Sequence, residues 1–149
     1  MKWLTRIVLI VAALFIVAQF IRPDLTNPAV DRRKALQAPP QVQSILDRSC
    51  HDCHSSETRW PWYTNITPVN WWLADHVKEG RRELNLSEWG GYSAKRRTRK
   101  FKEICDQVKE GEMPPKNYLW IHTDAKLSDE DRQTLCTWAA SERSLKSEE

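Results

Sequence analysis

Apolar residues recur at helical spacing along most of the chain. Side chains that repeat every three or four residues form one face of an α-helix, whereas a strand needs strict apolar–polar alternation. No stretch of this chain keeps such an alternation. The pattern therefore predicts an all-α fold, a small helical domain built from four segments at residues 41–53, 67–84, 93–111 and 127–143.

The ends of these segments carry helix start and stop signals. Thr67 and Pro68 suit the cap and first turn of the second helix, and Gly111 suits the end of the third. Ser128 and Asp131 have the spacing of a capping pair at the start of the fourth. The apolar stripe of the second helix is expected to contain Val69, Trp72, Leu73, His76 and Val77.

A different pattern opens the chain, where an apolar run extends from Ile7 to Ile21 after Lys2 and Arg6. It predicts a membrane anchor over residues 1–22, formed by a single N-terminal transmembrane helix. A removed secretory signal and a core helix are the alternatives. Large residues stand where signal cleavage needs small ones, which favours an uncleaved anchor. The preceding basic residues place the body across the membrane from the cytoplasm.

Four prolines and no apolar periodicity mark residues 23–40 as a tether. The folded domain is then expected over 41–142, followed by a polar tail at 143–149. A chain of 149 residues fits one domain with such appendages.

The net charge of the chain, +3, is too small to indicate a nucleic-acid partner. Eight tryptophans either fill a small core or enclose something flat and apolar.

The sequence "CHDCH" at residues 50–54 carries the candidate chemistry. C-x-x-C-H is the attachment pattern of c-type haem. Cys50 and Cys53, one helical turn apart, would form thioethers to the two vinyl groups, and His54 would supply the proximal imidazole. A zinc site, a thioredoxin-like redox pair and a Cys50–Cys53 disulfide are the alternatives. Each lacks support, because the chain offers no second ligand pair, no βαβ pattern and only a very short loop to close.

A six-coordinate iron needs a second axial ligand, often a thioether sulfur. Apart from Met1 at the chain start, Met113 is the available methionine, and two prolines stiffen the loop that holds it. Packing in the core is the alternative role for Met113. His76 and His122 are competing ligands, although structural hydrogen bonds would account for both.

Two further cysteines, Cys105 and Cys136, lie on the apolar sides of their predicted helices. In an oxidising compartment they suggest a disulfide between the third and fourth helices, and two buried free thiols are the alternative. The basic stretch at residues 95–100 is interpreted as a solvated helix face, or as a docking site for an acidic redox partner or anionic headgroups.

The loop after the motif should support the cofactor. Trp60, Trp62 and Tyr63 would either pack in the core or form a wall of the haem site, with a Trp N–H or Arg59 meeting the propionates. A carbonyl in the same loop would accept the second ring N–H of His54.

Four stretches together resemble the haem-binding domain family of bacterial envelope proteins. They are "CHDCHSSETRWPWYTNITPVNWW", "HVKEGRRELNLSEW", "GEMPPKNYLWIH" and "LSDEDRQTLCTWA". The chain is more loosely similar to class I cytochromes c. The resemblance implies a cytochrome c-like fold around one covalent haem c, with Cys50 and Cys53 as thioethers, His54 as the proximal iron ligand and Met113 as the distal one.

The function expected from these observations is electron transfer rather than catalysis, with an unknown redox partner protein. The protein would be a single-pass protein of the bacterial inner membrane, with its body facing the periplasm. A haem-based enzyme or gas sensor with a displaceable Met113 is the main alternative, and a haem that mainly stabilises the fold is another.

Overall fold

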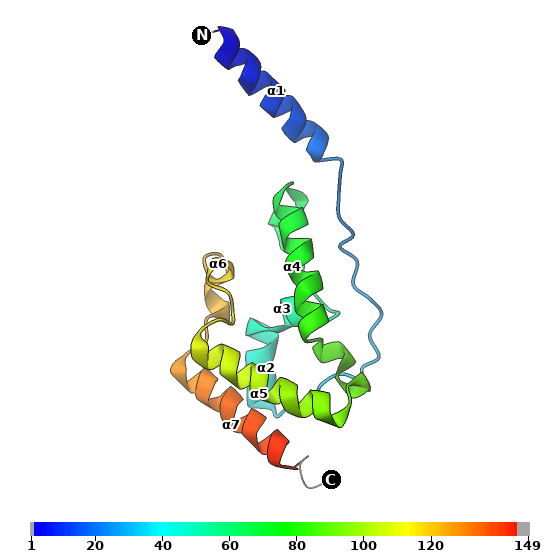
Figure 1. Cartoon of the computed structure of the whole chain (residues 1–149), viewed down its shortest axis with the longest axis vertical. Coiled ribbons are helices and arrows are strands. Elements are labelled where there is room, and N and C mark those ends of the chain that lie inside the picture. Colours follow the sequence, from blue (N-terminus) through cyan, green and yellow to red (C-terminus); the bar gives the residue numbers. More distant parts are fainter. Residues whose placement is uncertain (1, 146–149) are drawn as a thin grey trace.

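The computed structural model of the chain describes residues 2–145, and all regular structure in that range is helical (Figure 1). The expected all-α fold is therefore confirmed. Residues 146–149 of the expected polar tail, and Met1, lie outside the described residues. The elements are α1 (Lys2–Ala18), α2 (Pro40–Ser49), α3 (His51–His54), η1 (Trp62–Asn65), α4 (Val69–Glu83), η2 (Leu86–Gly91), α5 (Ala94–Glu110), α6 (Lys116–Leu119), η3 (Thr123–Ala125) and α7 (Asp129–Leu145).

The core lies where α5 and α7 pack side by side and α2 lies against them (Figure 1). Phe101 of α5 is completely buried between two tryptophan rings, with centroid distances of 4.8 Å to Trp89 and 5.2 Å to Trp138. Leu46 of α2 and Leu135 of α7 complete this centre. The helical stripes of the sequence thus meet in one apolar cluster, which holds the C-terminal helix against the helix that leads into the CHDCH motif.

Helix ends mostly follow the expected signals. Ser128 Oγ accepts from the Asp131 N–H at 3.0 Å, and an Asp131 carboxylate oxygen accepts from the Ser128 N–H at 2.8 Å. Gly111 ends α5 in the left-handed region, with a φ of 72°. The start of the second helix was predicted wrongly, because α4 begins at Val69 with Pro68 as its cap.

The buried apolar face of α4 is also narrower than the sequence predicted. Leu73 and Val77 are buried, but His76 is exposed and its Nδ1 contacts the Trp72 carbonyl at 2.8 Å. Helical spacing alone cannot tell how wide a buried face is, since that depends on what packs against it.

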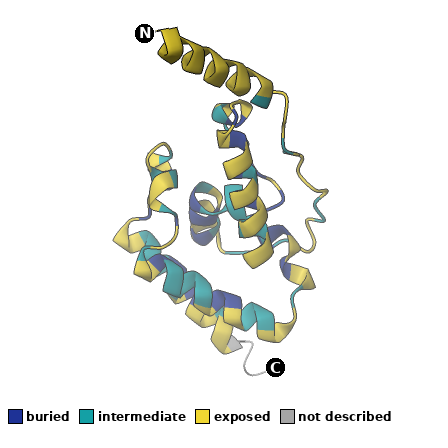
Figure 2. Ribbon diagram, turned by 45° about the horizontal axis from the view of Figure 1, so that its top comes forward, coloured by how far each residue is buried: buried dark blue, intermediate teal, exposed yellow. Residues whose placement is uncertain are grey.

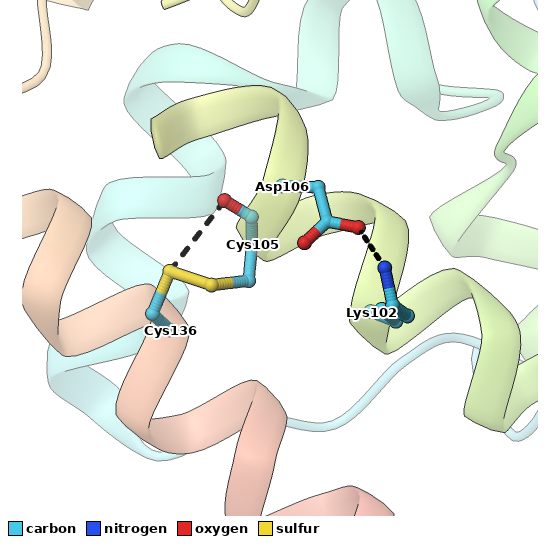
Figure 3. Close-up of a disulfide and its surroundings, with 4 residues drawn as sticks. All are labelled: Lys102, Cys105, Asp106 and Cys136. Carbon is cyan, nitrogen blue, oxygen red and sulfur yellow. Dashed lines mark hydrogen bonds and ion pairs between the residues drawn. A yellow bond between two sulfur atoms is a disulfide. The ribbon is translucent and has the colours of Figure 1, made fainter. Parts of the chain in front are cut away.

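A disulfide joins α5 to α7 (Figure 3). The sulfurs of Cys105 and Cys136 are 2.08 Å apart, across a sequence separation of 31 residues. Both side chains are half-buried against the core cluster. The link therefore fastens together the two long helices that pack side by side in the core.

Helix α1 stands apart from the core, and none of its residues is buried (Figure 2). Within the described range, no helix combines the length and the apolar character needed to cross a membrane. The expected transmembrane helix is therefore not supported. The helix contains 17 residues and stops at Ala18, before the apolar run of the sequence ends at Ile21.

Residues 19–36 connect α1 to the body without helix, and several contacts hold them in place. The Gln19 side chain pairs with both backbone groups of Thr67, at 2.9 Å and 3.1 Å. Further along, the Leu36 N–H donates to the Leu86 carbonyl at 2.8 Å, and Leu36 joins the core. The proline-containing connection is thus attached to the body at both ends.

Candidate functional site

The CHDCH motif occupies a break between two helices. Helix α2 ends at Ser49, Cys50 takes a non-helical φ of −127°, and the short α3 begins at His51. The His54 N–H still donates to the Cys50 carbonyl at 2.9 Å, so the motif remains one compact turn. Cys50 and Cys53 are both free thiols in the structure and both half-buried.

The thiols lie in surroundings that disfavour charge. Burial raises the pKa of Cys50 to about 12. Burial, reinforced by the neighbouring charge of Asp52, raises the pKa of Cys53 to about 11. Both sulfurs are therefore protonated near neutral pH in this structure, which disfavours disulfide exchange.

One side of the motif is fixed by the C-terminal end of α4. His54 Nδ1 lies 2.9 Å from the Gly80 carbonyl oxygen and 3.1 Å from the Leu84 carbonyl oxygen. Because carbonyl oxygens only accept, Nδ1 carries the proton and donates it. Burial also lowers the pKa of His54, so the ring is neutral. Its other nitrogen, Nε2, is thereby left with a lone pair directed away from α4.

This contact overturns the expected partner of His54, which was a carbonyl in the loop after the motif. The acceptors come instead from α4, at least 26 residues further along the chain. The Leu84 carbonyl follows the last helical residue, and the Gly80 carbonyl accepts from the Leu84 N–H at 2.9 Å as well as from His54. The end of a helix also carries a partial negative charge, which makes it a suitable support for an imidazole N–H.

A small hollow with a volume of about 10 Å³ lies beside Cys53. Apolar side chains of α4 form one wall, and aromatic side chains from η1 and α6 form another. The lining residues are Asp52, Cys53, Thr58, Arg59, Pro61, Tyr63, Leu73, Val77, Tyr118 and His122.

Polar contacts connect the walls of this hollow. The Tyr63 hydroxyl lies 2.7 Å from His122 Nε2, and the His122 ring stacks on Tyr118 at 4.2 Å. Tyr118 donates to an Asp52 carboxylate oxygen at 3.3 Å, and Arg59 pairs with the same carboxylate at 2.9 Å. Burial raises the pKa values of Tyr63 and Tyr118, so both remain protonated donors.

A family model described as a haem-binding domain matches residues 13–141. The chain belongs to the haem-binding domain family. No curated protein and no solved structure matches it. The family assignment establishes haem as the cofactor, and it covers the motif, α4, α5 and most of α7.

The residues around the CHDCH motif of this haem-binding domain are suited to binding haem. Two free thiols lie one turn apart, and the adjacent imidazole has one nitrogen fixed and the other free. A further buried donor is available in the loop after the motif, since Trp60 Nε1 has no hydrogen-bond partner among the described residues. Arg59, the alternative propionate contact, is instead occupied by Asp52.

The other candidate ligands are dispersed. Met113 is 37% exposed and lies in the loop after α5, where its N–H donates to the Gln107 carbonyl at 3.2 Å. It is not among the residues that line the hollow beside Cys53, whereas His122 is. His76 is exposed and lies against Trp72 of its own helix, and His51 lies 3.4 Å from Asp47.

Arg81 also holds the loop after the motif in place, a role that was not predicted from the sequence. Arg81 Nε donates to the Ser55 carbonyl at 2.7 Å, and another of its nitrogens donates to Thr58 Oγ1 at 2.8 Å. Arg81 comes from the same end of α4 that holds His54. An arginine one residue after a glycine gives no signal of this role in the sequence.

Gly80 allows α4 to approach the motif. A Cβ at this position would lie 2.6 Å from the Cys53 carbonyl oxygen, which is too close for backbone atoms. We expect Gly80→Ala to push α4 from α3 and weaken the His54 contact, costing about 1–3 kcal/mol of unfolding free energy. Urea unfolding of the haem-loaded protein measures this loss. Gly91→Ala is the matched control, because a Cβ there meets nothing within 4 Å. Equal stability of the two variants would contradict the packing argument.

Proposed function

We propose that this haem-binding domain is a mono-haem c-type electron-transfer protein. In this proposal Cys50 and Cys53 form the thioether bonds, and His54 binds the iron through Nε2. The observation that carries the proposal is the double hydrogen bond of His54 Nδ1 to Gly80 and Leu84, beside two free thiols one turn apart. A backbone-held Nδ1–H fixes both the tautomer and the orientation of an iron-binding imidazole.

Bound haem would supply a reversible one-electron couple. The chain holds and orients that group. The C-terminal end of α4 places partial negative charge behind His54, which strengthens the imidazole as a donor. The hollow beside Cys53 supplies the apolar side chains of Leu73 and Val77. Trp60 Nε1 is proposed as a donor to a propionate oxygen, because it is buried without another partner in the described range.

Met113 is proposed as the second iron ligand. Gly111 ends α5 abruptly, and Pro114 and Pro115 restrict the loop that follows. The thioether side chain is 37% exposed and is not part of the core cluster. A core-packing role for Met113 therefore has little support, and the side chain remains available as a ligand.

The test of this ligand is the absorption spectrum of the oxidised protein after expression with the haem-maturation machinery. The wild type is expected to show the weak far-red band of methionine–iron ligation, and Met113→Ala is expected to lose it. Met113→His is expected to lower the potential by at least roughly 0.1 V, within the ~0.8 V range that axial ligands span. Glu112→Ala, exposed in the same loop, is the matched control. An unchanged spectrum in Met113→Ala would reject this ligand.

A haem-based sensor or enzyme is the second candidate function. The observation that favours it is the hollow beside Cys53, which is lined by Tyr63, Tyr118 and His122 rather than by Met113. Hydrogen-bond donors in an open distal pocket are typical of gas binding. Carbon monoxide distinguishes the two functions, since rapid binding to the reduced wild type indicates an open site and absence of binding indicates a carrier.

We also propose that α1 attaches the protein to the bacterial inner membrane, with the body in the periplasm. The support is physical, because an apolar helix with no buried residue needs a covering in water. Lys2 and Arg6 at its start favour a cytoplasmic N-terminus. The Cys105–Cys136 disulfide suits an oxidising compartment. Fractionation of cells should recover the protein with the membranes, and recovery in the soluble fraction would reject this location.

A further inference from the structure

Large apolar side chains outside α1 are exposed mainly near the start of α4 and the end of α6. Trp62 is 75% exposed, Trp120 is 81% and Ile121 is 67%. Trp71 and Trp72, at the start of α4, are 39% and 44% exposed. We call these five residues the aromatic edge. Exposed apolar clusters of this kind mark interaction sites, since isolated chains rarely leave several tryptophans in water.

Two contacts connect the segments that carry the aromatic edge. The 2.7 Å contact of the Tyr63 hydroxyl with His122 joins η1, which contains Trp62, to the segment after α6, which contains Trp120 and Ile121. On the other side, Trp71 Nε1 donates to the Ile21 carbonyl at 2.8 Å. The aromatic edge therefore begins where α1 ends.

The opposite end of the body has a different character. Both views place α5 and α7 on the side remote from α1, with the start of α4 and α6 on the near side (Figures 1 and 2). A second hollow lies there, lined by Lys95, Arg99, Lys102 and Arg143 together with Ala94 and Thr98. Apolar aromatic and charged surfaces are thus separated along the axis that runs away from α1.

We propose that the aromatic edge rests in the interfacial region of the same bilayer that receives α1. This orientation deepens the proposed membrane attachment and rests on it. Tryptophan is enriched at membrane interfaces because its ring is apolar while its N–H seeks a polar partner. The Gln19–Thr67 and Trp71–Ile21 contacts hold the end of α1 against this edge, so a bilayer that covers α1 reaches the edge as well.

The haem group and a protein partner are the other possible coverings. The hollow beside Cys53 is lined by Tyr63 and Tyr118 but by none of the five residues of the aromatic edge. A protein partner would leave the continuity between α1 and the edge unexplained. A lipid surface would cover both α1 and the aromatic edge, so a single environment accounts for the exposure of both.

The test is hydroxyl-radical footprinting of the haem-loaded full chain bound to vesicles of phosphatidylethanolamine and phosphatidylglycerol. The reference is Leu9→Asp/Leu14→Asp, which carries two charges on α1 and remains in solution. We expect Trp62 and Trp120 to be oxidised at least about five-fold more slowly in the vesicle-bound wild type than in this reference. Tyr92, half-buried at the α5 end, is the internal control and should keep its rate.

Each outcome decides one proposal. A wild type that fails to sediment with vesicles rejects membrane attachment, and the aromatic-edge proposal with it. Sedimentation with equal oxidation of Trp62 and Trp120 in both proteins rejects the aromatic edge alone. Tryptophans already protected in the soluble reference would assign the covering to haem, and protection of Tyr92 instead would mean that the basic end faces the lipid.

Discussion

The variant Cys50→Ser/Cys53→Ser is expected to carry no covalently bound haem after expression with the maturation machinery. Only these two described cysteines are free, since Cys105 and Cys136 are bonded to each other. Serine preserves the size and polarity of the turn but cannot form a thioether. Mass spectrometry of the denatured protein should find the wild type heavier by one haem and the variant at the mass of the polypeptide alone.

The matched control for this variant is Cys105→Ser/Cys136→Ser, which also removes two sulfurs but leaves the motif intact. It should keep its covalent haem. Each single variant, Cys50→Ser or Cys53→Ser, should retain one thioether and therefore keep the added mass. Covalent haem in the double motif variant, or its absence from the matured wild type, would overturn the proposed attachment.

Removal of the disulfide is expected to produce the largest loss of stability. A cross-link across 31 residues restricts the unfolded chain, and its loss should cost about 3–4 kcal/mol. The denaturation midpoint of Cys105→Ser/Cys136→Ser should therefore fall by roughly 1–3 M urea. Spectroscopy should show that the variant still binds haem in the absence of urea, because the motif lies on α3 and its support on α4.

Chemical reduction provides the control for that experiment. Thioether bonds to haem resist thiol reductants, whereas a disulfide does not. The wild type with reductant should therefore unfold at the same urea concentration as the variant, and reductant should leave the variant unchanged. Alkylation of both Cys105 and Cys136 in the unreduced wild type would show that no disulfide forms.

Local signals in the sequence predicted the parts of the fold that depend on neighbouring residues. Ser128 and Asp131 cap each other because both groups lie within one turn, and Gly111 ends α5 because glycine adopts a positive φ at little cost. The motif itself is also local, so the residues that suit haem could be identified without a structure.

The support of the site could not be predicted in the same way. The partners of His54 are backbone carbonyls, and every residue has one, so only the tertiary packing of α4 selects Gly80 and Leu84. The exposure of His76 and Trp72 similarly depends on what α4 packs against. The membrane-spanning prediction rested on the composition of the first 22 residues, whereas α1 contains only 17.

The segment between α1 and α2 is fixed to the body at several points, and this limits how far the body can travel. The Asn27 amide donates to the Thr58 carbonyl at 2.9 Å, and Arg81 donates to the Asn27 side-chain oxygen at 2.7 Å. The Gly90 N–H donates to the Lys34 carbonyl at 2.7 Å. A flexible linker would let the domain reach partners within a wide volume around its point of attachment. Because these contacts fix the segment, the domain cannot search in this way. In the proposed membrane-attached protein, encounters would depend on lateral diffusion of the whole protein or on partners that arrive from solution.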